Sequence, residues 1–576
     1  MKNLYTPYLH YLLNGETNPT IEFVVASLNE SMNNGNSCLD INNFVNENNL
    51  NMNEVIYNIC QSSFVVKVNF SIEIEEIPNI PILLVEFKDN YLLYINRYFY
   101  YEKHIVRNIN LLNCKTQPIN TTDLLFQKIS FVKQTLSSLS TNKSFPNHDQ
   151  LDSIISSLSR KFSIITGGPG TGKTTSVFFL LWSFQQMYGD NISLNICAPT
   201  GKASKRIKES LLFNINSFAN ITGLEVNNLL QIINKTDIFG TIHKTLGVIL
   251  NNIYFRHNAS KKLAIDILFI DESSMIGLPV FYKLIDAIDS ETIKHIIFLG
   301  DSNQLSSVEE GYVFSSLVNN AKNSDYLNEL KISNRNKGDI AKFSNAILYN
   351  KIADIKSILT NSSEIQILPP SLYQIINNSL DKNSNFIKLV ECANNFDQSS
   401  YEQLFSLLTD STILCMTNVG YLGTKSLNYQ IEARIKNIYK FNTLWYPGRI
   451  IIILENDSSE KNLSQRLYNG DIGVCVMRNK KPSIYFDEGR SFIPERLPKY
   501  DLAFAISIHK SQGSEYDNVS IVIPNNYNKI LRKELVYTAI TRTKKLVKIY
   551  SNPDTLIKAI NIDGKRISGL QYLLEN

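Results

Sequence analysis

From Phe162 onward, short apolar runs alternate with longer segments of helical periodicity. The runs FSII, LNICA, ILFI and HIIFL each end in a polar or glycine-rich cluster. Such runs between helical segments are typical of strands in a parallel sheet that is buried on both faces. The polar clusters then lie at the carboxyl ends of the strands, where open α/β sheets bind ligands.

The same pattern resumes late in the chain, at STILC, NVSIVIP and LVKIYS. We therefore expect an α/β protein with two parallel sheets, divided near residue 330. Residues 445–505 interrupt the second pattern with short β-rich segments and turn signals, which predict a small β-barrel inserted into the second sheet.

The first 115 residues mix helical periodicity with apolar runs such as IPILLVEF and carry no chemical motif. They predict a separate mixed, largely helical domain. Residues 116–146 hold two polar segments around one helical stretch and predict a linker region.

Composition narrows the class of protein only a little. A chain of 576 residues is long enough for three or four domains. Its net charge of +4 is too small to indicate nucleic-acid binding by itself. Seven scattered cysteines without a C-x-x-C pair argue against a zinc site or a disulfide framework.

The sequence has no secretory signal and no run near the ~20 apolar residues of a membrane helix, which predicts a cytoplasmic protein without membrane contact.

The stretch GGPGTGKT fits G-x-x-x-x-G-K-[ST] and follows the apolar run FSII. Its glycines allow backbone N–H groups to surround phosphate oxygens at the start of a helix. Lys173 is expected to reach the β- and γ-phosphates, and Thr174 to offer its hydroxyl to Mg²⁺. The predicted nucleotide-binding residues of this loop are Gly167, Gly168, Pro169, Gly170, Thr171, Gly172, Lys173, Thr174 and Thr175.

Two further positions bear on the same site. In ILFIDE, Asp271 stands at a strand end to hold Mg²⁺, and Glu272 can polarise the attacking water. These residues together indicate nucleoside triphosphate hydrolysis. Gln150, 23 residues before Lys173, can offer its amide to an adenine edge, although its position by itself favours a surface glutamine.

Other strand-end clusters distinguish among nucleotide hydrolases. APTGKAS and TIHKTLG combine hydroxyls, lysines, a histidine and glycines, which can bind a phosphodiester backbone without reading bases. Far downstream, HKSQGSEY is a second polar, glycine-centred loop. Gln304 in GDSNQL lies within reach of a γ-phosphate, and Arg542 begins a final strand. An arginine supplied across a cleft stabilises charge in phosphoryl transfer. His243 and His509 could be metal ligands, but neither has a second ligand at helical spacing.

In order and spacing, these motifs resemble those of superfamily 1B DNA helicases and, more narrowly, of the RecD family, the alpha subunits of exodeoxyribonuclease V. The resemblance covers roughly residues 147–552 and is carried by FSIITGGPGTGKT, APTGKA, TIHKTLG, DESSMI, GDSNQLSSVEEGYVF, HKSQGSEY and YTAITRTKK. It implies two RecA-like domains, at 147–330 and 331–576. It also implies an SH3-like barrel near 445–505, a wedge hairpin near 254–266 and an N-terminal partner-docking domain at 1–115. The segment 254–266 could equally be a basic connecting loop.

The resemblance also implies a role for individual residues. Gln150 would contact adenine, and Lys173, Thr174, Asp271 and Glu272 would bind and hydrolyse ATP–Mg²⁺. Gln304 would sense the γ-phosphate, with Arg335 and Arg542 as arginine fingers. The residues implied to hold single-stranded DNA are Thr200, Lys202, Thr241, His243, His509, Ser511 and Gln512. The chain departs from the family at Asn336, where an aromatic residue is frequent, and at Lys244, where arginine is frequent.

By this resemblance the chain is an ATP-dependent 5′→3′ DNA helicase or translocase subunit. Its partners would be RecB-like and RecC-like subunits in a heterotrimer that processes single-stranded DNA and duplex ends in double-strand-break repair and recombination. The nuclease would belong to another subunit. A stand-alone DNA repair helicase, or a structural subunit with a decayed motor, remain as alternatives. The motor interpretation requires residues 509–516 to lie beside the cleft that Lys173 faces.

Overall fold

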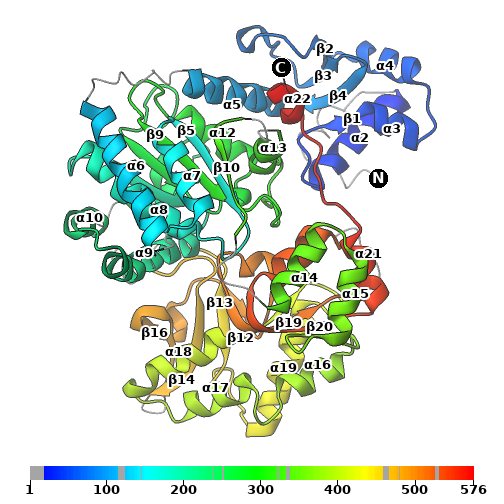
Figure 1. The fold of residues 1–576 in the computed structure, drawn as a ribbon. Coiled ribbons are helices and arrows are strands. Elements are labelled where there is room, and N and C mark those ends of the chain that lie inside the picture. The colour runs from blue at the N-terminus through cyan, green and yellow to red at the C-terminus, as the bar shows by residue number, and fades with distance from the viewer. Residues whose placement is uncertain are drawn as a thin grey trace.

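The computed structural model describes residues 18–114, 124–143, 146–235, 238–249, 252–320, 324–332, 338–457, 466–478, 481–525 and 531–575. It holds two parallel sheets, an antiparallel sheet inserted in the second, and a mixed N-terminal body (Figure 1). This is the α/β architecture that the apolar runs predict. In the described part of the chain, no helix combines the length and apolar character needed to cross a membrane.

The first lobe, as we call the body around the first parallel sheet, has the strand order β10-β5-β9-β8-β6-β7. Its strands are β5 (Phe162–Gly167), β6 (Leu194–Ala198), β7 (Phe239–Thr241), β8 (Ile267–Ile270), β9 (His295–Gly300) and β10 (Leu327–Leu330). One face is covered by α6 (Leu124–Lys143), α7 (His148–Leu158), α8 (Lys173–Tyr188) and α9 (Gly201–Thr222). The other face is covered by α12 (Leu278–Asp286) and α13 (Val313–Asn320). The short helices α10 (Asn227–Ile233) and α11 (Ile242–Leu246) flank β7 in sequence.

The second lobe is built on the parallel sheet β11-β20-β19-β12-β18. These strands are β11 (Ile365–Leu368), β12 (Ser411–Cys415), β18 (Ala505–Ser507), β19 (Tyr516–Val522) and β20 (Thr543–Tyr550). The helices are α14 (Asp339–Leu348), α15 (Ile352–Asn361), α16 (Leu372–Ser379), α17 (Asn385–Asn394), α18 (Tyr401–Asp410), α19 (Thr424–Tyr439), α20 (Lys533–Ile540) and α21 (Pro553–Ile560). One apolar core runs through this lobe.

Between β12 and β18 the chain forms an antiparallel sheet of order β16-β15-β14-β13-β17. Its strands are β13 (Ile450–Ile453), β14 (Ile472–Arg478), β15 (Lys481–Tyr485), β16 (Ser491–Phe492) and β17 (Tyr500–Leu502). Among the residues described, no pairing joins β16 to β17, so the sheet is open there. The insertion is present where the sequence predicts it, and its SH3-like character stays a prediction.

The N-terminal body contains the four-stranded sheet β1-β4-β3-β2. Its strands are β1 (Leu39–Asp40), β2 (Val65–Asn69), β3 (Ile82–Phe87) and β4 (Asn90–Ile95), with helices α2 (Pro19–Asn33), α3 (Ile41–Glu47), α4 (Met52–Gln61) and α5 (Asn96–Cys114). Helix α5 packs against α12, so this body shares a continuous apolar core with one face of the first sheet.

The end of the chain departs from the predicted division. After α21 the chain leaves the second lobe, and α22 (Leu570–Glu575) packs on α5 and α13 (Figure 1, red). The second predicted domain, 331–576, therefore includes a segment that lies against the N-terminal body. A short apolar helix at a chain end carries no sequence signal for the surface on which it packs.

Candidate nucleotide site between the two lobes

A cavity of about 450 Å³ lies where the two lobes meet. The first lobe lines it with the phosphate loop and with Asp271, Glu272 and Gln304. The second lobe adds Gly513, Glu515, Thr541 and Arg542. Because Gly513 and Glu515 belong to HKSQGSEY, this stretch does border the cleft that Lys173 faces, as the sequence predicts.

The two lobes meet the cavity with different edges of their sheets. In the first lobe, the phosphate loop follows β5 and Asp271 follows β8, so the carboxyl ends of the strands face it. In the second lobe, Glu515 and Arg542 immediately precede β19 and β20. Arg542 thus stands at the start of the last strand of this sheet, as the sequence predicts, just after the end of helix α20.

The phosphate loop is held by bonds within itself. The Lys173 Nζ donates to the carbonyl oxygens of Gly167, at 2.6 Å, and Gly168, at 3.2 Å. Gly172 has φ of +88°, and a Cβ there would lie 2.0 Å from the Gln150 amide nitrogen. Only glycine fits this position, and the loop then leads directly into α8, whose first residues line the cavity.

Gln150 supports this loop from behind. Its side chain is fully buried, and Nε2 donates to the Thr171 carbonyl at 3.1 Å. Its Oε1 accepts from the Asn147 backbone N–H, in a capping box at the start of α7. Gln150 is therefore not the surface glutamine that the sequence alone leaves open, and its contact with adenine stays a prediction.

The carboxylate pair after β8 sits at the wall of the cavity. Loss of hydration raises the pKa of Asp271 to about 6, and the neighbouring Glu272 charge adds to this, while Lys173 and Arg206 oppose it. Glu272 has φ of +50°, a conformation rare for a residue with a side chain and often found at functional sites. A divalent cation would favour the charged form of Asp271, and the Thr174 hydroxyl lines the same cavity. These two residues fit Mg²⁺.

Arg542 crosses from the second lobe to the first. It is 3% exposed, and Nη2 donates to the Gln304 Oε1 at 2.6 Å. Nη1 donates to the Ser514 carbonyl at 3.3 Å, within HKSQGSEY. Burial lowers the pKa of Arg542 below its ordinary value, although the guanidinium stays charged at neutral pH.

The sequence did not single out a second charged contact across the cavity. Arg206, on α9, forms an ion pair with Glu515 in the second lobe, and both line the cavity. Glu515 stands in the quoted stretch HKSQGSEY, but nothing in the sequence names its partner.

Two residues predicted to bind DNA have other partners in this structure. Ser511 has no exposed surface and donates to the Ile508 carbonyl at 2.7 Å. Gln512 donates through Nε2 to the Leu305 carbonyl, 3.0 Å away in the first lobe. The Leu305 N–H in turn donates to the Thr538 hydroxyl oxygen at 2.9 Å. This arrangement does not support a direct DNA contact of Ser511 or Gln512, because both side chains are buried and Gln512 bonds to the first lobe.

The remaining predicted DNA residues lie at helix or turn starts. Thr200 and Thr241 cap α9 and α11 by accepting from Ala203 and Lys244 backbone N–H groups, which leaves each hydroxyl proton available to donate. Lys202 is half-buried and His243 is exposed. His509 is half-buried and follows β18.

The structure does not test two further predictions, the second arginine finger and the wedge hairpin. Arg335 lies outside the described residues. In segment 254–266, Phe255 forms an antiparallel bridge with Val248, which precedes the segment, and Asn258 forms one with Lys261. The Tyr254 side chain is 66% exposed. The wedge role of this segment stays a prediction.

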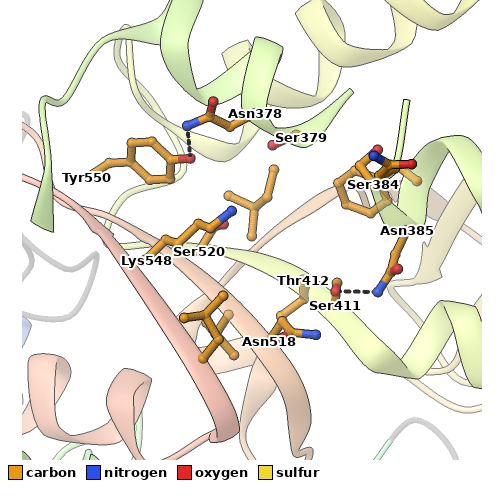
Figure 2. Close-up of a pocket in the computed structure, with 15 residues that line it drawn as sticks. Asn378, Ser379, Ser384, Asn385, Ser411, Thr412, Asn518, Ser520, Lys548 and Tyr550 are labelled. Atoms are coloured by element: carbon orange, nitrogen blue, oxygen red, sulfur yellow. Dashed lines mark hydrogen bonds between the residues drawn. The ribbon is translucent and has the colours of Figure 1, made fainter. Parts of the chain in front are cut away.

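A second cavity, of about 280 Å³, lies on the second lobe (Figure 2). It is bounded by β12, β19 and β20 and by the ends of α16 and α17, and Lys548 and Tyr550 line it. Its lining residues are separate from those of the nucleotide cavity.

Comparison with known proteins agrees with this geometry. A family model described as an AAA domain matches residues 150–310, and one described as a UvrD-like helicase C-terminal domain matches residues 502–550. The RecBCD enzyme subunit RecD of Haemophilus influenzae is 31% identical over 473 residues, which are 73% of this chain and 72% of that protein. The protein of the same name from Buchnera aphidicola subsp. Schizaphis graminum is 30% identical over 555 residues, 86% of either chain.

More distant similarities extend the comparison. The ATP-dependent RecD2 DNA helicase of Deinococcus radiodurans is 23% identical over 389 residues, which are 66% of this chain and 46% of that protein. Among solved structures, Bacteroides Pif1 bound to ssDNA has a TM-score of 0.40 at 15% identity and covers 71% of this chain and 93% of that chain.

Proposed function

The chain belongs to the RecD family, and from that premise we propose that it is the 5′→3′ DNA motor of a RecBCD-type helicase–nuclease. It is an ATP-dependent DNA helicase of recombination and repair, and it binds ATP through its phosphate loop. The heterotrimer, the direction of movement and the role of each residue are parts of the proposal.

One observation carries the proposal: a single cavity is lined by Lys173 and Asp271 from one lobe and by Glu515 and Arg542 from the other. A nucleotide held there contacts both lobes, so its binding, hydrolysis and release change how the lobes fit together. A static nucleotide-binding module would have no need for a buried arginine from a second lobe.

In the proposed cycle, the γ-phosphate displaces the Lys173 bonds to Gly167 and Gly168. It also draws Arg542 away from Gln304. Mg²⁺, held by Thr174 and Asp271, would supply charge compensation on the phosphates. Glu272 accepts a proton from the attacking water, and Arg542 stabilises the negative charge of the transferring phosphoryl group. Arg335 is proposed as a second finger, on family resemblance.

The DNA strand is proposed to follow the helix starts beside the cavity. Thr200 and Lys202 belong to the first lobe at α9, Thr241 and His243 to the same lobe at α11, and His509 to the second lobe. If grip alternates between the lobes as the cavity opens and closes, a single strand advances in one direction.

The N-terminal body is proposed to dock a partner subunit in the cytoplasm. Its helices leave large apolar side chains at the surface, with Phe23 44% and Tyr57 65% exposed. Exposed aromatic side chains of this kind are typical of interface anchors. RecB-like and RecC-like subunits are the partners that the family implies.

The test compares Lys173→Gln with the matched variant Lys356→Gln, which alters an exposed lysine on α15. The purified chain and its co-expressed complex are assayed for ATP turnover and for unwinding of duplexes with 5′ or 3′ single-stranded tails. We expect Lys173→Gln to lower DNA-stimulated turnover by roughly 100-fold or more, because it removes the positive charge that would stabilise the transferring phosphoryl group.

Wild-type and Lys356→Gln protein are expected to unwind the 5′-tailed duplex in preference to the 3′-tailed one. If Lys173→Gln protein unwound the 5′-tailed duplex as fast as wild-type protein does, the motor of this chain would be inactive in the native complex. Processive unwinding by the purified chain alone would favour a stand-alone helicase.

A further inference from the structure

Four side chains form a continuous hydrogen-bonded chain across the cleft. The Tyr537 hydroxyl donates to the Asp301 Oδ2 at 3.1 Å, and the Gln304 Nε2 donates to the same oxygen at 3.1 Å. The Gln304 Oε1 then accepts from the Arg542 Nη2. Tyr537 and Arg542 come from α20 and its end, so one helix of the second lobe contacts both ends of a short loop of the first.

All four side chains are buried, with exposed fractions of 1–6%. Burial raises the pKa of Asp301, and the Lys173 charge and hydrogen bonds from Asn303, Gln304 and Tyr537 oppose that rise. Burial also raises the pKa of Tyr537, so its hydroxyl keeps its proton and donates. Water has little access to replace any of these bonds, and each lost donor leaves Asp301 poorly compensated.

This chain of bonds determines which way the Gln304 amide points. A carboxylate only accepts and a guanidinium only donates, so Nε2 must face Asp301 and Oε1 must face Arg542. When a γ-phosphate attracts Arg542, the bond to Asp301 keeps the amide in place. Gln304 then presents a carbonyl oxygen to the cavity, which can accept a hydrogen bond from the attacking water while Glu272 takes the proton.

The Tyr537 hydroxyl also lies beside the phosphate loop. A Cβ placed on Gly168 would be 3.2 Å from it. The Gly168 carbonyl is one of the two that accept from Lys173. Tyr537 is therefore next to the loop that holds the nucleotide and bonded to the residue that orients Gln304.

We propose that Tyr537 is a positioning residue for ATP hydrolysis, whose hydroxyl holds Asp301 and thereby orients the Gln304 amide when the lobes close. The inference rests on the proposed function and deepens it. Tyr537 acts through Asp301 and Gln304, and it coordinates neither nucleotide nor DNA.

The test is Tyr537→Phe, which removes one oxygen atom and keeps the ring. Its matched control is Tyr550→Phe, a buried tyrosine of the same lobe whose hydroxyl accepts from Asn378 at 3.0 Å in the second cavity (Figure 2). We expect Tyr537→Phe to lower DNA-stimulated kcat roughly tenfold, the loss of one hydrogen bond to a charged group. The KM for ATP should change less than about twofold, because hydroxyl and substrate do not touch.

A second readout does not depend on turnover. Hydrogen exchange of the peptide 301–308 should accelerate in Tyr537→Phe and stay at the wild-type rate in Tyr550→Phe. A general loss of folding would accelerate exchange throughout α20 and lower the unfolding midpoint, and it would overturn the positioning role.

The two proposals fail in different ways. If wild-type protein hydrolyses ATP and Tyr537→Phe matches it in kcat, the positioning role is wrong and the motor stands. If kcat and KM change together, Tyr537 serves binding and the inference is also wrong. If wild-type protein shows no turnover, the motor proposal fails, and unchanged exchange at 301–308 would additionally overturn the contact through Asp301.

Discussion

At the scale of single residues, the site is held together by bonds that a ligand must replace. Lys173 donates to its own loop, and Arg542 to Gln304. Each cation thus has neutral acceptors where a phosphate would offer charged ones. Since a phosphate adds attraction between opposite charges to these already charge-assisted hydrogen bonds, exchange toward phosphate is favourable.

A buried histidine beside this sheet provides a prediction about pH. His295, at the start of β9, bonds through Nδ1 to the Arg160 carbonyl at 2.7 Å and through Nε2 to the Tyr188 hydroxyl at 2.8 Å. Burial lowers the pKa of His295 to about 4. An unfolded histidine titrates near 6.5, so between these values the unfolded chain binds more protons and stability falls as pH falls.

We expect wild-type protein to lose about 2 kcal/mol more stability than His295→Gln between pH 7.5 and pH 5. Urea unfolding in a Trp445→Phe background measures this through Trp182, which lies in the first lobe. The exposed His148, replaced by glutamine, should keep the wild-type loss. Equal losses in wild type and His295→Gln would contradict the prediction.

At the scale of elements, the end of the chain connects two bodies. Ser568 and Ser37 both donate to the Glu102 Oε1 at 2.6 Å, and the Tyr94 hydroxyl donates to Oε2 at 2.8 Å. A Cβ on Gly569 would lie 2.0 Å from the Tyr94 hydroxyl oxygen, so only glycine fits at this position. The segment that leads into α22 thus closes over a buried carboxylate of the N-terminal body.

Truncating the apolar anchor of this segment should loosen it. Leu570 is fully buried, and Leu570→Ala is expected to cost about 3 kcal/mol, from lost apolar contact and a residual cavity. Leu111→Ala on α5, where the side chain is 39% exposed, should cost well under 1 kcal/mol. Denaturant unfolding measures both. A loss below about 1 kcal/mol for Leu570→Ala would show that α22 contributes little.

At the scale of the whole molecule, the lobes touch at a second place besides the nucleotide cavity. Lys205 on α9 pairs with Asp487 at 2.5 Å and Glu488 at 3.2 Å, both in the inserted sheet. A Cβ on Gly201 would lie 3.2 Å from the Tyr468 ring of the same insertion. The insertion therefore rests on the start of α9, beside the proposed DNA contacts.

Breaking this contact should free the insertion without harming the ATP site. In Lys205→Met, exchange of the peptide 487–493 should accelerate about fivefold, as expected for the loss of roughly 1 kcal/mol. The KM for ATP should stay within about twofold of wild type. Lys208→Met, on the same helix with its ammonium over the Phe239 ring, is the matched control. Unchanged exchange in Lys205→Met would show that the pair adds nothing to the docking.

The sequence by itself determined what depends on near neighbours in the chain. The phosphate loop, the Asp271–Glu272 pair and the buried strands follow from residue types at short spacings, because local backbone geometry and apolar periodicity act over a few residues. The inserted sheet was equally predictable from its turns.

Only the tertiary structure decided which distant groups meet. Ser568 and Glu102 are separated by 466 positions, and Tyr537 and Asp301 by 236. The family resemblance implied that Gln512 binds DNA, yet its side chain donates to the Leu305 carbonyl, 207 positions away in the other lobe. Such pairings depend on which surfaces pack together, and that is set by the summed burial of whole elements and not by any local pattern.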